Sequence, residues 1–157
     1  MKHIISIMLE NEAGALSRVS GLFSSRGYNI ESLTVAPTND KGLSHMTIVT
    51  HGNDQQLEQI VKQLNKLIDV LKVINLTEEK HIIRDLMLIK LFVKEENQLK
   101  IKDLIDEFSC KLLKNKDQHY IIEISGDSKI IDKFLAKVTF AEILEVSRTG
   151  ISAILDA

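Results

Sequence analysis

The sequence has few of the residues that mark secreted or membrane-bound proteins. It contains one cysteine, one proline and no tryptophan in 157 residues, and aromatic residues make up 4% of it. A single cysteine cannot form a disulfide within the chain, which is typical of a reducing compartment. No apolar run approaches the roughly 20 residues that a membrane-spanning helix needs, and Met1 leads directly into a short apolar strand instead of a signal peptide. We therefore expect a cytoplasmic protein without a membrane partner.

The sequence also lacks the spacings that indicate catalysis. It has no phosphate-binding glycine loop, no His/Cys cluster with metal-ligand spacing and no nucleophile–base set. We interpret Cys110 as a small, partly buried apolar residue, and His3, His45 and His51 as residues on strand surfaces. The net charge of −2 and the dispersed basic residues give no surface for nucleic acid. We expect no catalytic site, no metal site and no nucleic-acid partner.

Hydrophobic periodicity in the first half of the chain switches repeatedly between the strand and helix periods. It predicts strands at 3–9, 28–36, 43–51 and 70–76, and helices at 14–26 and 54–68. The resulting order, βαββαβ, is that of the ferredoxin-like sandwich, in which both helices cover one face of an antiparallel four-stranded sheet.

The second half of the chain repeats this pattern. It predicts strands at 85–93, 111–113, 120–124 and 143–146, a helix at 99–108, and another helix after Gly126-Asp127-Ser128. That tripeptide repeats Gly52-Asn53-Asp54 about 74 residues later. The predicted fold class is therefore α+β, with two tandem ferredoxin-like domains at 1–78 and 79–157.

The first strand is apolar on both sides, because Ile5, Ile7 and Leu9 alternate with Ile4 and Met8. The helix-free face of the first sheet should then be covered as well, and we expect a second copy of the chain to cover it. This predicts a homodimer.

Two asparagines flank the first predicted helix, and the residues around them suit a small amino acid. Gly14, Ala15 and Leu16 leave the backbone amides of the first helical turn open to a carboxylate. Asn11 and Asn29 offer amide oxygens to an ammonium group, and Leu16 and Ile30 leave an apolar gap for a short branched side chain. Another interpretation stays open, in which Asn11 only caps the helix and Asn29 only follows a glycine turn.

The positions of the two asparagines constrain any shared ligand. In a right-handed βαβ unit the strands run parallel, so Asn11 at the end of one strand and Asn29 at the start of the next lie at opposite ends of the sheet. If both contact one small ligand, they come from two copies related by a two-fold axis.

The sequence resembles the small regulatory subunits of bacterial acetolactate synthase, whose N-terminal half is an ACT domain. The resemblance is dense over the first 75 residues or so, and weaker to the end of the chain. It is carried by four segments: Leu9–Val19, Gly21–Phe23, Arg26–Thr38 and Ser44–Ile48. Weaker similarity reaches the closing segment Ile143–Gly150, whereas Glu95–Lys116 departs most from the family pattern.

The resemblance implies a site for valine between two ACT domains. The effector-loop pattern of the family falls on Asn11, Gly14, Ala15 and Leu16, and the pattern of the second chain falls on Asn29 and Ile30. Position 13 is alanine where relatives often have serine, a change that we expect to be mild.

The resemblance also implies the role of the protein. Proteins of this family are non-catalytic subunits that bind no cofactor themselves. They raise the activity of a large catalytic subunit and confer valine feedback inhibition in branched-chain amino-acid synthesis, and the resemblance implies the same role here. Thiamine diphosphate, magnesium and FAD are expected on the large subunit. The alternative is a stand-alone ACT-type amino-acid-binding regulator without an enzyme partner; its transcriptional form is disfavoured because no helix-turn-helix pattern is present.

Overall fold

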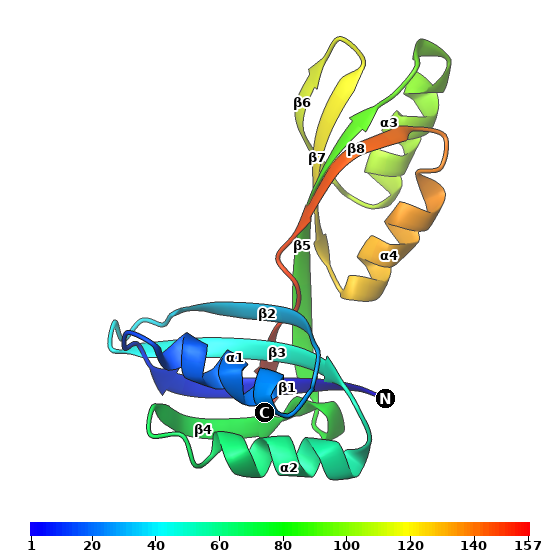
Figure 1. The fold of residues 1–157 in the computed structure, drawn as a ribbon. Helices are drawn as coiled ribbons and strands as arrows, with labels where there is room; N and C mark the ends of the chain where they lie inside the picture. The colour runs from blue at the N-terminus through cyan, green and yellow to red at the C-terminus, as the bar shows by residue number, and fades with distance from the viewer. The chain divides into compact units, whose positions relative to one another are not determined.

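The chain folds into two compact units, each built from helices and strands. The computed structural model describes all 157 residues; unit 1 contains Met1–Ile82 together with Ile151–Ala157, and unit 2 contains Ile83–Gly150. In each unit, two helices cover one face of an antiparallel sheet (Figure 1); the first sheet has four strands and the second has five. The predicted α+β class with two ferredoxin-like units is thereby confirmed. None of the helices combines the length and apolar character needed to cross a bilayer.

Unit 1 has the predicted βαββαβ order. Its sheet has the strand order β2-β3-β1-β4, and all neighbours are antiparallel. The elements are β1 (Lys2–Glu10), α1 (Ala15–Ser25), β2 (Ile30–Pro37), β3 (Leu43–His51), α2 (Asp54–Leu64) and β4 (Val70–Asn75), followed by a short 3-10 turn at Leu76–Glu78.

The core of unit 1 lies between the sheet and its two helices. Alternate residues of β1 and β3 point toward the helices and meet the apolar stripe of each helix. The fully or almost fully buried members include Ile5, Ile7, Leu9, Val19, Phe23, Met46, Ile48, Ile60 and Leu64. Helix α2 begins with a capping box, in which Asn53 Oδ1 accepts from Gln56 N at 2.8 Å and Gln56 Oε1 accepts from Asn53 N at 2.9 Å.

Helix α2 is shorter than its hydrophobic stripe predicts. The stripe extends to Leu67 and predicted a helix to residue 68, but the helix ends at Leu64. Single turns then follow, because Leu67 N donates to Leu64 O and Val70 N donates to Leu67 O, both at 3.1 Å. The chain leaves the helix early because Asp69 O accepts from Glu10 N at 2.8 Å, which fixes the entry into β4 beside β1.

Unit 2 repeats this architecture with the strand order β6-β7-β5-β8. The cap that the sequence predicts is present, since Asp127 Oδ1 accepts from Lys129 N at 2.9 Å. The elements are β5 (His81–Phe92), a 3-10 turn (Glu95–Asn97), α3 (Gln98–Glu107), β6 (Lys111–Lys116), β7 (His119–Gly126), α4 (Ser128–Lys137) and β8 (Glu142–Arg148).

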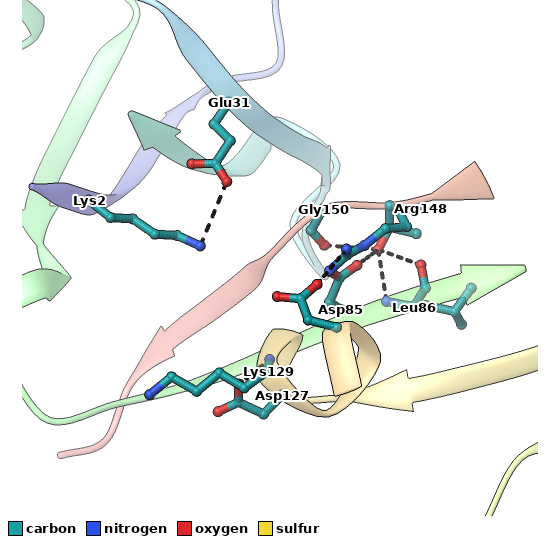
Figure 2. A network of polar contacts seen from close by, with 10 residues as sticks. Lys2, Glu31, Asp85, Leu86, Asp127, Lys129, Arg148 and Gly150 are labelled. Carbon is teal, nitrogen blue, oxygen red and sulfur yellow. Dashed lines mark hydrogen bonds and ion pairs between the residues drawn. The ribbon is translucent and has the colours of Figure 1, made fainter. Parts of the chain in front are cut away.

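An ion pair in unit 2 joins the segment where the chain enters it to the segment where the chain leaves it. Asp85 on β5 is 3% exposed, and Arg148 at the end of β8 donates to its Oδ2 from Nη2 at 2.5 Å and from Nε at 3.1 Å (Figure 2). Arg148 Nη1 also donates to Asp132 on α4 at 2.9 Å. The arginine fork therefore ties both ends of the unit to one helix.

A last strand, β9 (Ser152–Leu155), was not expected from the sequence. It pairs with β5, and its residues belong to unit 1. Thr34 Oγ1 donates to Ile151 O at 3.0 Å, and Ala153 N donates to Thr47 Oγ1 at 3.2 Å. Thr47 points away from the helices of unit 1, so β9 lies on the helix-free face of that sheet. Val49 on this face is 1% exposed.

This strand corrects two expectations. The helix-free face of unit 1 was expected to be covered by a second copy, but the chain's own C-terminal strand covers part of it. The domain limits expected from the sequence, 1–78 and 79–157, also differ from the two units, because residues 151–157 lie with the first unit. A strand of only four residues, Ser152–Leu155, is too short for its hydrophobic periodicity to indicate which part of the chain it packs against.

The docking of β9 predicts a large loss of stability at one position and almost none at its neighbour. Ala153 is 1% exposed, whereas Ile154 is 59% exposed. Ala153→Asp would place an unpaired carboxylate against the sheet, so we expect β9 to detach and the free energy of unfolding to fall by about 1–3 kcal/mol. Ile154→Asp is the matched control and should change it by less than about 0.5 kcal/mol. Urea unfolding followed by circular dichroism measures both; equal losses would contradict this position of β9.

Candidate functional site

The loop after β1 is held by the turn between β2 and β3. Asn11 N donates to Gly42 O at 2.8 Å, and Asn11 Nδ2 donates to Lys41 O at 3.0 Å. The side chain is exposed, and its hydrogen bond to Lys41 does not use Oδ1, which remains an acceptor. The interpretation of Asn11 as a helix cap is therefore wrong, because Gly14 is the N-cap of α1 and no side chain caps it.

Gly14 gives this loop a shape that other residues adopt with difficulty. Its φ of 83° lies in the left-handed region, and a Cβ there would come within 2.9 Å of Arg18 Nη1. After Gly14, α1 begins without a side-chain cap or an acidic residue in its first turn. The amides of Leu16 and Ser17 have no backbone acceptor, so they are free to bind an anion at the positive end of the helix.

Ala15 does not have the open amide that the sequence predicts. Its N–H donates to Glu12 O at 3.2 Å, and its methyl group is 3% exposed in the core of unit 1. Ala15 therefore anchors the loop, and the residues that present free groups are its neighbours Gly14 and Leu16. Leu16 is 45% exposed, which leaves an apolar surface beside the free amides.

An ion pair that the sequence did not predict fixes the same loop. Arg18 Nε donates to Asp69 Oδ2 at 2.5 Å, and Arg18 Nη2 donates to Ala13 O at 3.3 Å. Asp69 is 5% exposed, and the hydrogen bond from Arg18 lowers the pKa of its carboxyl group below the usual value. In the sequence, the partner of Arg18 is marked only by a single acidic residue, Asp69, directly before a strand.

Asn29 and Ile30 lie at the other end of the sheet. Ile30 pairs with Thr50 on β3, whereas Glu10, just before Asn11, pairs with Leu43 at the opposite end of that strand. Thr50 lies seven residue steps along β3 from Leu43, a span of about 23 Å. The two halves of the predicted site are thus far apart within one chain, as expected from the sequence.

The surroundings of Asn29 agree in part with the turn interpretation. Gly27 has φ 70° and ends α1, and Tyr28 N donates back to Phe23 O at 2.9 Å. Asn29 O accepts from Thr50 Oγ1 at 2.7 Å, which anchors its backbone, and its side chain is exposed. Ile30 is half-buried and packs against the core.

Two histidines of unit 1, His3 and His45, are less exposed than expected. His3 is 2% exposed, with its Nε2 at 3.0 Å from Gly52 O, so its assignment to a strand surface is wrong. His45 is half-buried, with Nε2 at 2.8 Å from Ser6 Oγ, and burial lowers the pKa of its imidazole. His51 is exposed and lies 3.1 Å from Glu31, which also faces Lys2 (Figure 2).

Cys110 is a partly buried apolar residue, as predicted. It packs against the core of unit 2, and burial raises the pKa of its thiol to about 11. Because a thiol with so high a pKa is protonated at neutral pH, it is a poor nucleophile.

The Arg18–Asp69 pair predicts how stability depends on pH. The folded pKa of Asp69 is lowered, so the pair stabilises the fold fully above the pKa of an unfolded aspartate, near 3.9, and loses this effect as the pH falls through the folded pKa. We expect Asp69→Asn to be less stable than the parent above about pH 5, and the difference to shrink steadily in more acidic solution. Urea unfolding at several pH values measures this.

The control for this prediction is Glu58→Gln. The pKa of Glu58 is also lowered, by Lys62 at 2.7 Å, but both side chains are more than half exposed and solvent screens them. Its effect should be clearly smaller; a difference between parent and Asp69→Asn that stays constant with pH would contradict the prediction.

Comparisons with known proteins agree over both units. The family described as "AHAS small subunit-like ACT domain" matches residues 5–72, and the family described as "Small subunit of acetolactate synthase" matches residues 84–156. The chain is 47% identical to the acetolactate synthase small subunit of Buchnera aphidicola subsp. Schizaphis graminum, over 98% of each chain. It is also 47% identical to the acetolactate synthase isozyme 3 small subunit of Escherichia coli K12, over 96% of this chain and 93% of that one.

A solved structure supports the same assignment. The acetolactate synthase small subunit from Thermotoga maritima superposes with a TM-score of 0.90 at 33% identity, covering 100% of this chain and 98% of that one. The chain therefore belongs to the family of acetolactate synthase small subunits, the regulatory ACT-domain subunits of that enzyme.

Proposed function

We propose that this subunit raises the activity of a large catalytic subunit and confers feedback inhibition by valine, which binds between the ACT units of two copies. One observation carries the proposal. The loop around Gly14 and the loop around Asn29 both expose groups that suit a free amino acid, but about 23 Å of β3 lies between them. A ligand as small as valine contacts both loops only when they come from different chains.

The edge of the sheet suggests how two copies bring these loops together. Strand β2 is an edge strand, so one side of its backbone is free to pair with another strand. If two copies of β2 (Ile30–Pro37) pair antiparallel with their centres aligned, Asn29 of one copy lies opposite Thr38 of the other. Thr38 begins the turn whose Lys41 and Gly42 hold Asn11. The two half-sites then lie side by side, twice in each dimer.

The groups in this arrangement match the parts of an amino acid. The free amides of Leu16 and Ser17 bind the carboxylate, and the amide oxygens of Asn11 and Asn29 accept hydrogen bonds from the ammonium group. Leu16 and Ile30 provide apolar surface for a short branched side chain. The buried Asp69 holds Arg18 away from the ligand carboxylate, so the amides remain the anion-binding groups.

The small-subunit assignment implies a large catalytic partner, on which we place thiamine diphosphate, magnesium and FAD. Valine acts on that partner through the dimer, and it shifts the activity only as far as its affinity differs between the active and inhibited arrangements. A coupling free energy of about 1–3 kcal/mol between the two sites, typical of allosteric proteins, would be enough for strong inhibition. The stand-alone regulator is disfavoured, because the relatives matched over nearly the whole chain are named as synthase subunits.

Substituting the asparagine of the second loop tests the split site. Asn29→Ala removes the ammonium acceptor but keeps the backbone bond to Thr50, so we expect valine affinity to fall at least tenfold while activation of the large subunit stays within twofold. Asn39→Ala, in the exposed turn between β2 and β3, is the matched control and should bind valine as the parent does. Titration calorimetry and assays of the reconstituted enzyme measure the two effects.

Substituting Gly14 separates charge from backbone strain. Gly14→Ala and Gly14→Asp share the unfavourable φ and the contact of a Cβ with Arg18, but only the aspartate places a carboxylate beside the free amides. We expect the alanine variant to retain weak valine inhibition and the aspartate variant to lose it. Valine inhibition of the Gly14→Asp variant at the parent level would contradict the assignment of this loop to the valine site.

The side-chain preference of the site is a separate test. The reconstituted enzyme is titrated with valine, leucine and isoleucine, and we expect valine to inhibit at the lowest concentration because the gap between Leu16 and Ile30 suits a short branched chain. A strictly monomeric subunit that still binds valine with full affinity would contradict the dimer site.

A further inference from the structure

Thr50, near the end of β3, contacts both residues of the second loop of the proposed valine site. Its hydroxyl group donates to Asn29 O at 2.7 Å, and in the ladder of β2 and β3 it lies directly opposite Ile30. Thr50 is 1% exposed and points toward the helices, as Ile48 does two residues earlier. A buried residue therefore lies directly behind the exposed Asn29.

The two asparagines of the proposed site are oriented by different contacts. Asn11 is held through its own side chain, because its Nδ2 donates to Lys41 O at 3.0 Å and leaves Oδ1 free. The side chain of Asn29 is exposed and makes no hydrogen bond within the chain. The direction of the Asn29 side chain therefore depends on its backbone, whose carbonyl group accepts from Thr50.

The segment around Asn29 has an anchor on each side but belongs to neither helix nor strand. Before it, Tyr28 N donates to Phe23 O at 2.9 Å, which ties the chain to the end of α1. After it, Ile30 begins β2. If the bond from Thr50 were lost, the carbonyl group of Asn29 could turn toward water, and the side chain would change direction with it.

The ladder between β2 and β3 holds the start of β2 only weakly. Its register shifts between Ile30 and Ser32, and the pairing continues from Ser32 to Pro37. Such a shift interrupts the regular hydrogen bonding of a ladder. The hydroxyl group of Thr50 thus supports the loop at the point where the backbone pairing is irregular.

We propose that Thr50 is a positioning residue of the valine site. Its hydroxyl group sets the direction of the Asn29 side chain, and thereby places the amide oxygen that accepts a hydrogen bond from the ammonium group of the ligand. Thr50 itself is buried and does not touch the ligand. This inference rests on the proposed function, and it adds a residue that acts on affinity only through Asn29.

Side chains that differ by a hydroxyl group test this role in the full-length chain. Thr50→Val replaces the hydroxyl group with a methyl group and keeps the branch at Cβ, whereas Thr50→Ser keeps the hydroxyl group. In titration calorimetry we expect Thr50→Val to weaken valine binding about three- to tenfold, the effect of one lost hydrogen bond. Thr50→Ser should bind as the parent does. If Thr50→Val folds poorly, the comparison of Thr50→Ala with Thr50→Ser replaces it.

Thr47→Val is the matched control. Thr47 is also buried on β3, at 0% exposed, but it lies on the opposite face of the sheet, and its hydroxyl group accepts from Ala153 N at 3.2 Å. Both valine substitutions remove one buried hydroxyl group, so urea unfolding should show similar losses of stability. Only Thr50→Val should weaken valine binding. Equal losses of affinity in the two variants would overturn the proposal.

A double-mutant cycle shows whether Thr50 acts through Asn29. In the Asn29→Ala background no amide oxygen remains to be positioned, so adding Thr50→Val should leave the remaining valine affinity unchanged. A residue with a purely structural role would instead lower the affinity by the same factor in both backgrounds, and that result would overturn the proposal.

The same measurements separate this inference from the proposed function. If Asn29→Ala weakens valine binding but Thr50→Val binds as the parent does, the valine site stands and the role of Thr50 is wrong. If Asn29→Ala itself binds valine as the parent does, the assignment of Asn29 to the site is wrong, and the role of Thr50 is wrong with it.

Discussion

The ion pair between Arg18 and the buried carboxylate of Asp69 fixes the part of the molecule on which the proposed function depends. It joins the first turn of α1 to the entry of β4, while the backbone of Asp69 binds the last residue of β1. Two strands and a helix thereby meet at one loop. Because Arg18 donates to Asp69 and to Ala13 O, its guanidinium does not compete with the free amides of the first helical turn for an anion. The loop is therefore preorganised for a small anion before any ligand arrives.

The two units show two solutions to the same physical problem, a sheet with helices on only one face. In unit 1 the chain returns with β9, whose residues Ile151 and Ala153 are buried over Thr47. In unit 2 the corresponding face stays open, with a mixed pattern of lysine, glutamate and aliphatic residues. A covered face can bury apolar residues such as Ile4 and Val49 beside a polar Thr47, whereas the open face of unit 2 carries charged side chains.

Sequence periodicity predicted the eight strands and four helices of the two ferredoxin-like patterns, because most of these elements bury one face. Strand direction also predicted that the loops at Gly14 and Asn29 lie at opposite ends of the sheet, while their role as two half-sites stays a prediction. The sequence pattern did not reveal contacts between residues that are far apart in the chain. Arg18 and Asp69 are 51 residues apart, and Ala153 and Thr47 are 106 residues apart. The buried His3 and the engaged amide of Ala15 were missed for a related reason, since local patterns do not show which neighbours cover a residue.

A site shared by two copies makes ligand binding and dimerisation one equilibrium. If valine binds only the paired ACT units, each occupied site stabilises the dimer by about 2.7 kcal/mol when valine exceeds its dissociation constant a hundredfold. That free energy is of the size needed to couple two sites in a regulated enzyme. The ligand then needs no hinge or lid within one chain, because locking two copies together already selects one arrangement.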